Sequence, residues 1–222
     1  MKRIFLELLD WIYKKKCYFC GSSKESLRMC SNCFEDMEQS PVAVNRDIAG
    51  VKVYCAGVYE SNIQKLIRGL KYHNQRDLAY FQAKLMYDYW KNVLNEHDNY
   101  QVVPIPLFSK REKQRKYNQM TLVANEFCKL TGYNINLNLV KRVKDTIPQY
   151  KLSKVQRMDN LANAFVINMD EISKENGCKN ILLLDDICTT GSTFENIIIE
   201  LKKHGINNIT CFATTTPFNE AT

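Results

Sequence analysis

The sequence contains no apolar run that approaches the roughly 20 residues needed to span a membrane as a helix. It is also poor in glycine and proline, with eight and five among 222 residues. Hydrophobic residues make up 45% of the chain and charged residues 25%, which is near the average for globular domains. These proportions exclude collagen-like, low-complexity and wholly disordered chains. At about 150 residues per domain, the length suffices for one full core and a small additional module.

The N-terminus lacks the pattern of a secretion signal. Its apolar start is broken by Glu7 and Asp10, and three lysines at 14–16 follow where a cleavage site of small residues would be needed. The nine cysteines are odd in number, which argues against a disulfide framework in the absence of secretion. We therefore expect a short amphipathic N-terminal helix and a cytoplasmic protein in a reducing compartment.

Strand-like and helix-like segments alternate from about residue 50 onward, whereas residues 1–45 show no regular pattern. Strands are expected at 51–59, 102–107, 164–167, 181–184 and 209–213, and helices at 61–71, 76–95, 119–130 and 194–204. The strand segments are continuous apolar runs, as in strands that are buried on both faces. The sequence thus predicts an α/β domain whose mainly parallel sheet is flanked by helices.

The most informative segment, residues 181–193, reads ILLLDDICTTGST. A buried strand brings Asp185 and Asp186 to its C-terminal end, where ligands bind in open α/β sheets. The small hydroxyl residues that follow lead into a helix, so backbone N–H groups, hydroxyls and the helix N-terminus can hold a phosphate monoester. The carboxylates would repel that anion and need another role, either accepting hydrogen bonds from sugar hydroxyls or holding Mg²⁺ through water. A phosphate beside a diol describes a ribose 5-phosphate; the alternative is an ordinary capped helix with two acids exposed by chance.

This segment resembles the phosphoribosyl-pyrophosphate-binding motif of the type I phosphoribosyltransferases. The resemblance implies a fold of that type, in which Asp185 and Asp186 bind the ribose 2′- and 3′-hydroxyls, and a ligand that arrives with Mg²⁺. The loop that wraps the 5-phosphate would comprise Thr189, Thr190, Gly191, Ser192 and Thr193. Cys188 stands where a larger residue is common in those enzymes. No residue of the sequence is indicated as catalytic.

Four cysteines form two C-x-x-C pairs, Cys17 with Cys20 and Cys30 with Cys33. Each pair aims two thiolates at one point, and two pairs complete a tetrahedral Zn²⁺ shell. Because such a shell leaves no open position, the zinc is expected to be structural and to supply the folding energy of a segment with few apolar residues. Redox-active or free thiols are the alternative, although a redox pair would stand beside a thioredoxin-like element. We expect a zinc module over 1–45 and a second domain over 46–222.

Positive charge is concentrated in residues 110–116, which read KREKQRK, within a chain of net charge +7. Such a cluster attracts phosphate-bearing partners, although a solubilising loop would have the same composition. Tyr117 follows this run, and Tyr72 and His73 follow Lys71. Aromatic rings beside cations can stack the bases of a single strand, and packing in the core is the alternative.

The order of these features, four cysteines ahead of a phosphoribosyltransferase-like domain, resembles that of the ComF (ComFC) family of competence proteins. Residues 103–107 (VPIPL) and 115–119 (RKYNQ) are similar to two motifs of that family, with Lys116 in place of a glycine. A third similar stretch comprises Gln149, Leu152, Arg157, Asn160, Ala164 and Phe165.

The resemblance implies a role in natural transformation, with single-stranded DNA and a ComFA-type helicase as partners. The residues expected to contact nucleic acid or a diphosphate are Lys110, Arg111, Lys113, Arg115, Lys116 and Tyr117. Two other functions stay open: an active phosphoribosyltransferase with an unidentified acceptor, and a scaffold whose pocket is vestigial and whose zinc module docks a helicase.

Overall fold

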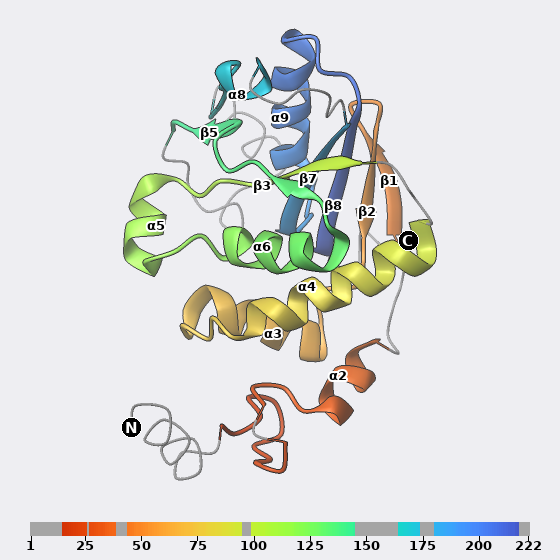
Figure 1. Cartoon of the computed structure of the whole chain (residues 1–222), viewed down its shortest axis with the longest axis vertical. Coiled ribbons are helices and arrows are strands. Elements are labelled where there is room, and N and C mark those ends of the chain that lie inside the picture. Colours follow the sequence, from red (N-terminus) through yellow and green to blue (C-terminus); the bar gives the residue numbers. More distant parts are fainter. Residues whose placement is uncertain are drawn as a thin grey trace.

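A computed structural model describes residues 15–25, 27–38, 44–94, 99–144, 164–173 and 180–217. Its centre is a six-stranded sheet in the order β1-β2-β8-β7-β3-β4 (Figure 1). The strand pairs are parallel except for β1 with β2, which is antiparallel. The prediction of a mainly parallel sheet flanked by helices is therefore confirmed.

The strands of this sheet are short, and most are apolar. In sheet order they are β1 (Val44–Ile48), β2 (Val51–Cys55), β8 (Ile209–Thr215), β7 (Asn180–Ile187), β3 (Tyr100–Pro104) and β4 (Asn134–Ile135). Strand β7 is central, with Leu182 opposite Val102 of β3 and Thr210 of β8. A separate antiparallel pair consists of β5 (Val140–Arg142) and β6 (Phe165–Ile167).

Helices cover both faces of the sheet (Figure 1). One face packs against α3 (Ser61–Tyr72), α4 (Leu78–Tyr89) with its π-helical extension η1 (Trp90–Leu94), and α6 (Gln119–Thr131). The other face packs against α9 (Ser192–Lys203) and the β5–β6 pair. Because side chains alternate along a strand, Leu182 and Leu184 of β7 face the first layer, whereas Ile181 and Leu183 face the second.

Some elements differ from the expectation. Residues 44–48 form β1, because Ala49 and Gly50 adopt positive φ values of 51° and 69° and close a hairpin with β2. The segment 110–116 was expected as a loop, but it lies largely in helix α5 (Ser109–Arg115). The strand expected at 164–167 lies in the β5–β6 pair and not in the main sheet.

Two further short helices complete the description: α2 (Ser31–Glu38), which follows the second cysteine pair, and α8 (Asp170–Ser173). In the part of the chain that the structure describes, no helix combines the length and the apolar character needed to cross a membrane. The expected N-terminal helix and the positions of Gln149, Leu152, Arg157 and Asn160 lie outside the described residues.

Candidate functional site

A cavity of about 350 Å³ opens where β7 and β3 end. Residues from several elements of the fold line it, and those that carry charge or a hydroxyl group are Lys71, Tyr72, Arg111, Arg115, Arg142, Asp185, Asp186, Thr189 and Thr193. The structure thus brings the acidic pair and both ends of the hydroxyl loop together with two cations of the 110–116 segment. It adds Lys71 from α3, which the sequence indicated only as the cation before Tyr72 and His73, and Arg142 from β5, for which we had predicted no role.

The carboxylate of Asp186 is held at both oxygens. Lys71 Nζ donates to Oδ1 at 2.7 Å, and Gln119 Nε2 donates to Oδ2 at 2.8 Å. Arg115 Nη1 in turn donates to Gln119 Oε1 at 2.9 Å. Because Asp186 is 4% exposed, this network fixes its position and offsets the cost of burying its charge.

Asp185 is partly buried and has a different environment. Its Oδ1 accepts a hydrogen bond from the backbone N–H of Asp186 at 2.8 Å. Burial and the neighbouring charge of Asp186 raise the pKa of Asp185 well above its usual range, and Lys71 only partly opposes this.

The loop between β7 and α9 is supported from behind by β1. Arg46 Nη2 donates to the backbone oxygens of Cys188 and Thr189, each at 2.6 Å. Gly191 has φ +80°, and a Cβ atom built there would lie 2.1 Å from Ile48 Cδ1. The backbone conformation therefore favours glycine at 191, and a side chain there would also have to displace the end of Ile48.

The hydroxyl groups of this loop also contact one another. Thr190 Oγ1 and Ser192 Oγ are 2.6 Å apart, and Ser192 is buried at the start of α9. Thr189 and Thr193 line the cavity, whereas Thr190, Gly191 and Ser192 lie outside its lining.

The segment 110–119 divides into residues that line the cavity and residues that face solvent. Arg111 and Arg115 belong to the lining, whereas Lys110, Lys113 and Lys116 are exposed outside it. Tyr117 is partly buried, and its hydroxyl donates to the backbone oxygen of Leu70 in α3. Its ring lies beneath the guanidinium of Arg76, 4.5 Å from the ring centroid.

Lys116 has the left-handed conformation that glycine favours, with φ 64°. It therefore occupies, at an energetic cost, the backbone conformation for which the glycine of the similar motif is suited. Asn118, two residues further on, caps α6: its side chain accepts from Met120 N and donates to the backbone oxygen of Ile105.

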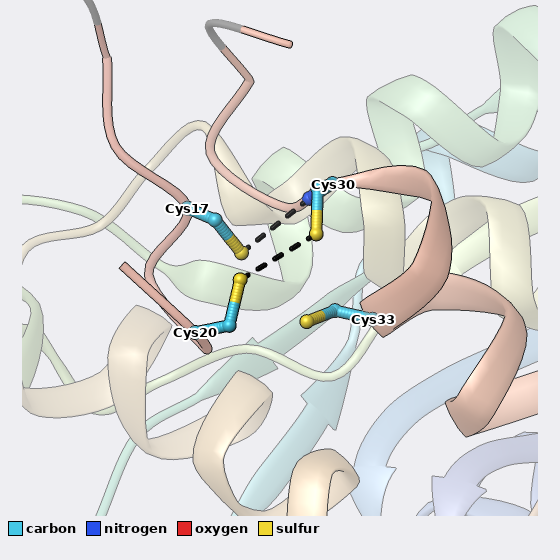
Figure 2. A group of neighbouring side chains, drawn as sticks. All are labelled: Cys17, Cys20, Cys30 and Cys33. Carbon is cyan, nitrogen blue, oxygen red and sulfur yellow. Dashed lines mark hydrogen bonds between the residues drawn. The ribbon is translucent and has the colours of Figure 1, made fainter. Parts of the chain in front are cut away.

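The four cysteines of the two C-x-x-C pairs form a second candidate site (Figure 2). Their sulfur atoms all lie within 4.8 Å of one another, and Cys20 Sγ is 3.7 Å from Cys30 Sγ. Sulfur atoms at about 2.3 Å from a tetrahedral zinc would be about 3.8 Å apart. The cluster therefore has the dimensions and the donor set of a metal site such as a zinc site.

Backbone N–H groups favour the thiolate form at Cys17. Burial alone would raise the pKa of this thiol, but N–H groups of Cys20, Cys30 and Phe19 outweigh it and lower the pKa to about 6. One of these contacts is the 3.4 Å hydrogen bond from Cys30 N to Cys17 Sγ. Because metals bind the deprotonated thiol, the lowered pKa of Cys17 suits a cation at the centre of the cluster.

The cysteine module, by which we mean the described residues from 15 to 38, packs against α3. The Tyr18 hydroxyl contacts His73 Nδ1, just after the end of α3. Lys65 of α3 donates to the backbone oxygen of Phe19 at 3.0 Å. Helix α3 thus contacts the cysteine module and also supplies Lys71 to the cavity.

Comparison with known proteins identifies relatives, although no family model matches the sequence. The chain is 32% identical to competence protein F of Haemophilus influenzae over 198 residues, which cover 87% of this chain and 81% of that protein. It is 27% identical to the DNA utilization protein YhgH of Salmonella typhi over 153 residues, 66% of this chain and 64% of that protein. The YhgH protein of Escherichia coli matches at 29% identity over 104 residues, 47% of this chain and 44% of that protein.

Proposed function

Because the chain belongs to the competence protein F family, we propose that it acts in DNA uptake during natural transformation. In this role it binds single-stranded DNA and carries a phosphoribosyl-pyrophosphate pocket in a type I phosphoribosyltransferase-like domain. The names of its relatives, which refer to competence and to DNA utilization, support the role in DNA uptake.

The observation that carries the pocket proposal is the cavity itself. It joins two carboxylates, two hydroxyl side chains of one loop and four cations, and its volume of about 350 Å³ lies in the range of roughly 300–1,000 Å³ typical of ligand sites. In the proposal, Asp185 and Asp186 accept hydrogen bonds from the ribose hydroxyls, the loop from Thr189 to Thr193 binds the 5-phosphate, and Arg111 and Arg115 bind the diphosphate.

The bonds that Asp186 already makes are compatible with this role. Each carboxylate oxygen can accept two hydrogen bonds, and each oxygen of Asp186 receives one from Lys71 or Gln119. Asp186 therefore keeps acceptor capacity for a sugar hydroxyl. Mg²⁺ bound with the ligand would neutralise its diphosphate, and the two acids are the residues that would hold it through water.

The charge beside the cavity supports the proposal of single-strand binding. Lys110, Lys113 and Lys116 are exposed around α5. There they can contact the backbone phosphates of DNA, which release their counterions on binding.

The cysteine module is proposed to hold a structural zinc, and a ComFA-type helicase is proposed as the protein partner. The division into a zinc module over 1–45 and a second domain over 46–222 stays a proposal; strand β1 of the sheet begins at Val44.

Two titrations test the proposed function. Fluorescence anisotropy with a labelled single strand measures DNA binding across a salt series, and calorimetry measures the heat of binding phosphoribosyl pyrophosphate with Mg²⁺. Replacing both acids, by Asp185→Asn with Asp186→Asn, is expected to abolish the heat and to leave the zinc content unchanged. Asp77→Asn, at an exposed acid paired with Lys15, is the matched control and should keep the heat of ligand binding.

The results that would overturn the proposal are also specific. A wild-type protein that binds no single strand at any salt concentration contradicts the DNA function. A wild-type protein that gives no heat with the sugar phosphate contradicts the pocket and favours a scaffold with a vestigial site.

A second candidate function is an active phosphoribosyltransferase acting on an unidentified acceptor. The position of Arg111 and Arg115 in the lining beside the acids favours it, because loss of pyrophosphate from C1 leaves a developing cation and a highly charged leaving group. Pyrophosphate release across a panel of bases and amines tests this function. No release with any acceptor would exclude turnover for that panel.

A further inference from the structure

Tyr72, the last residue of α3, exposes its ring at the cavity. Its side chain is 60% exposed, the highest fraction among the exposed large hydrophobic residues of the described segments, and it belongs to the cavity lining. Its neighbour Lys71 holds Asp186. An aromatic ring exposed at the edge of a polar cavity is suited to stacking on a flat partner.

Two guanidinium groups accompany this ring. Arg115 of α5 lies 5.3 Å from its centroid and Arg68 of α3 lies 5.8 Å from it. Proteins that bind single-stranded nucleic acid combine aromatic rings, on which bases stack, with cations that neutralise the phosphates between them. Tyr80 of α4 is also exposed, at 44%, but its ring packs edge-on against Phe81.

Arg115 also belongs to the network of the acidic pair. Its Nη1 donates to Gln119, whose amide donates to Asp186. A diphosphate in the cavity would draw this guanidinium inward, whereas a base and its phosphate at Tyr72 would hold it at the mouth. One guanidinium cannot neutralise both anions fully.

We infer that Tyr72, with Arg68 and Arg115, is a nucleobase-stacking subsite for single-stranded DNA at the mouth of the cavity, and that DNA and the sugar phosphate oppose each other's binding through Arg115. This inference rests on the proposed function; it selects Tyr72 from the candidate stacking rings of the sequence and adds a coupling between the two ligands. Internal nucleotides of DNA have no free diol to offer Asp185 and Asp186, so the strand lies across the mouth and does not fill the cavity. The opposition is thus a finite coupling, equal in both directions.

The test uses the full-length protein and a fluorescein-labelled thymidine oligonucleotide. Tyr72→Ala is expected to weaken DNA binding on the order of fivefold or more, because one base loses its stacking partner. Tyr72→Phe keeps the ring and should bind within about twofold of wild type. Tyr80→Ala is the matched control at an exposed tyrosine outside the cavity lining, and it should leave DNA binding unchanged.

The coupling is measured by repeating the anisotropy titration with saturating phosphoribosyl pyrophosphate and Mg²⁺. The apparent dissociation constant for DNA is expected to rise to a plateau with wild type and Tyr72→Phe, and to change little with Tyr72→Ala or Arg115→Met. This inference alone is overturned if Tyr72→Ala leaves DNA binding unaffected, or if DNA and phosphoribosyl pyrophosphate bind without influencing each other. Absence of any DNA binding by wild type overturns the proposed function as well.

Discussion

Lys71 Nζ lies 2.7 Å from Asp186 Oδ1, and the two side chains are only 15% and 6% exposed. The pair joins the last turn of α3 to the end of the central strand β7. A buried ion pair contributes little net stability relative to apolar side chains, but removing one partner leaves an uncompensated charge. Lys71 is therefore a structural requirement for an ionised Asp186.

Lys71→Met is expected to lower the free energy of unfolding by about 3 kcal/mol, because it leaves the buried Asp186 without its cation. Lys129→Met is the matched control: Lys129 is 69% exposed and pairs with Glu126 at 2.7 Å, and its replacement should cost less than about 1 kcal/mol. Urea unfolding at neutral pH measures both. Equal losses from the two substitutions would contradict the role assigned to Lys71.

The raised pKa of Asp185 predicts a specific dependence of stability on pH. Burial and the charge of Asp186 make the folded protein hold this proton more tightly than the unfolded chain. Stability is therefore lost as the pH rises from the ordinary aspartate range through the raised pKa. Asp185→Asn removes this loss and is expected to stabilise the protein at neutral pH.

Urea unfolding of wild type and Asp185→Asn between about pH 4 and pH 8 measures this difference. The stability advantage of the variant should shrink as the pH falls toward the ordinary aspartate range. A constant difference across the series would show that the pKa of Asp185 is not raised. In the proposed function, the same variant binds the sugar phosphate more weakly, so that stability and binding change in opposite directions.

The cysteine cluster predicts one bound zinc per chain. Cys30→Ser is expected to abolish it and to expose residues of the cysteine module to proteolysis, because metal binding supplies the folding energy of so small a unit. Cys128→Ser, at a thiol of α6 outside the cluster, should retain the zinc. Elemental analysis of the purified proteins decides the question. Equal zinc contents in the two variants would place the metal elsewhere.

Local pattern was enough to predict the strand, loop and helix over residues 181–203 and the cysteine cluster. A continuous apolar run specifies a buried strand, and a C-x-x-C pair brings two sulfur atoms together within one turn. The same reasoning did not yield β1, since VNRDI carries polar residues and its hairpin turn, Ala49-Gly50, is not a common turn sequence.

Contacts between distant segments were beyond the reach of sequence patterns. The partners of Asp186 come from positions 115 and 67 residues away, and the partner of the Cys188 backbone oxygen comes from 142 residues away. No local period places Lys71 and Gln119 at the cavity or Arg46 behind its loop. The motif RKYNQ did contain Gln119, but its role became visible only in the folded chain.

Lys116→Gly is expected to stabilise the protein by up to about 1 kcal/mol, because glycine adopts φ 64° without the strain of a side chain. Lys113→Gly is the matched control within α5, where glycine should cost about 1 kcal/mol. Both remove one exposed positive charge, so the comparison separates backbone strain from charge. Thermal unfolding measures the two changes, and a loss of stability in Lys116→Gly would contradict the assignment of strain.

Arg46 supports the loop from behind, and its replacement tests how the loop is shaped. Its guanidinium donates to the backbone oxygens of Cys188 and Thr189, so that these acceptors are bound from the side of β1. Arg46→Met removes this donor from both oxygens, although Cys188 O keeps the hydrogen bond from Thr216 Oγ1 at 2.9 Å, so the loss of stability should be about 1–3 kcal/mol in total. We also expect weaker binding of the sugar phosphate, because the loop loses a cation behind it.

Arg46→Lys separates the two effects. A lysine keeps the positive charge but lacks the planar group that reaches several acceptors at once, so it should recover part of the affinity and less of the stability. Lys52→Met, at an exposed lysine of the same hairpin, should change neither. Calorimetry with phosphoribosyl pyrophosphate gives the affinity, and urea unfolding gives the stability. If Arg46→Met keeps the affinity of wild type while losing stability, the loop does not depend on Arg46 for its binding geometry, and β1 contributes only to the fold.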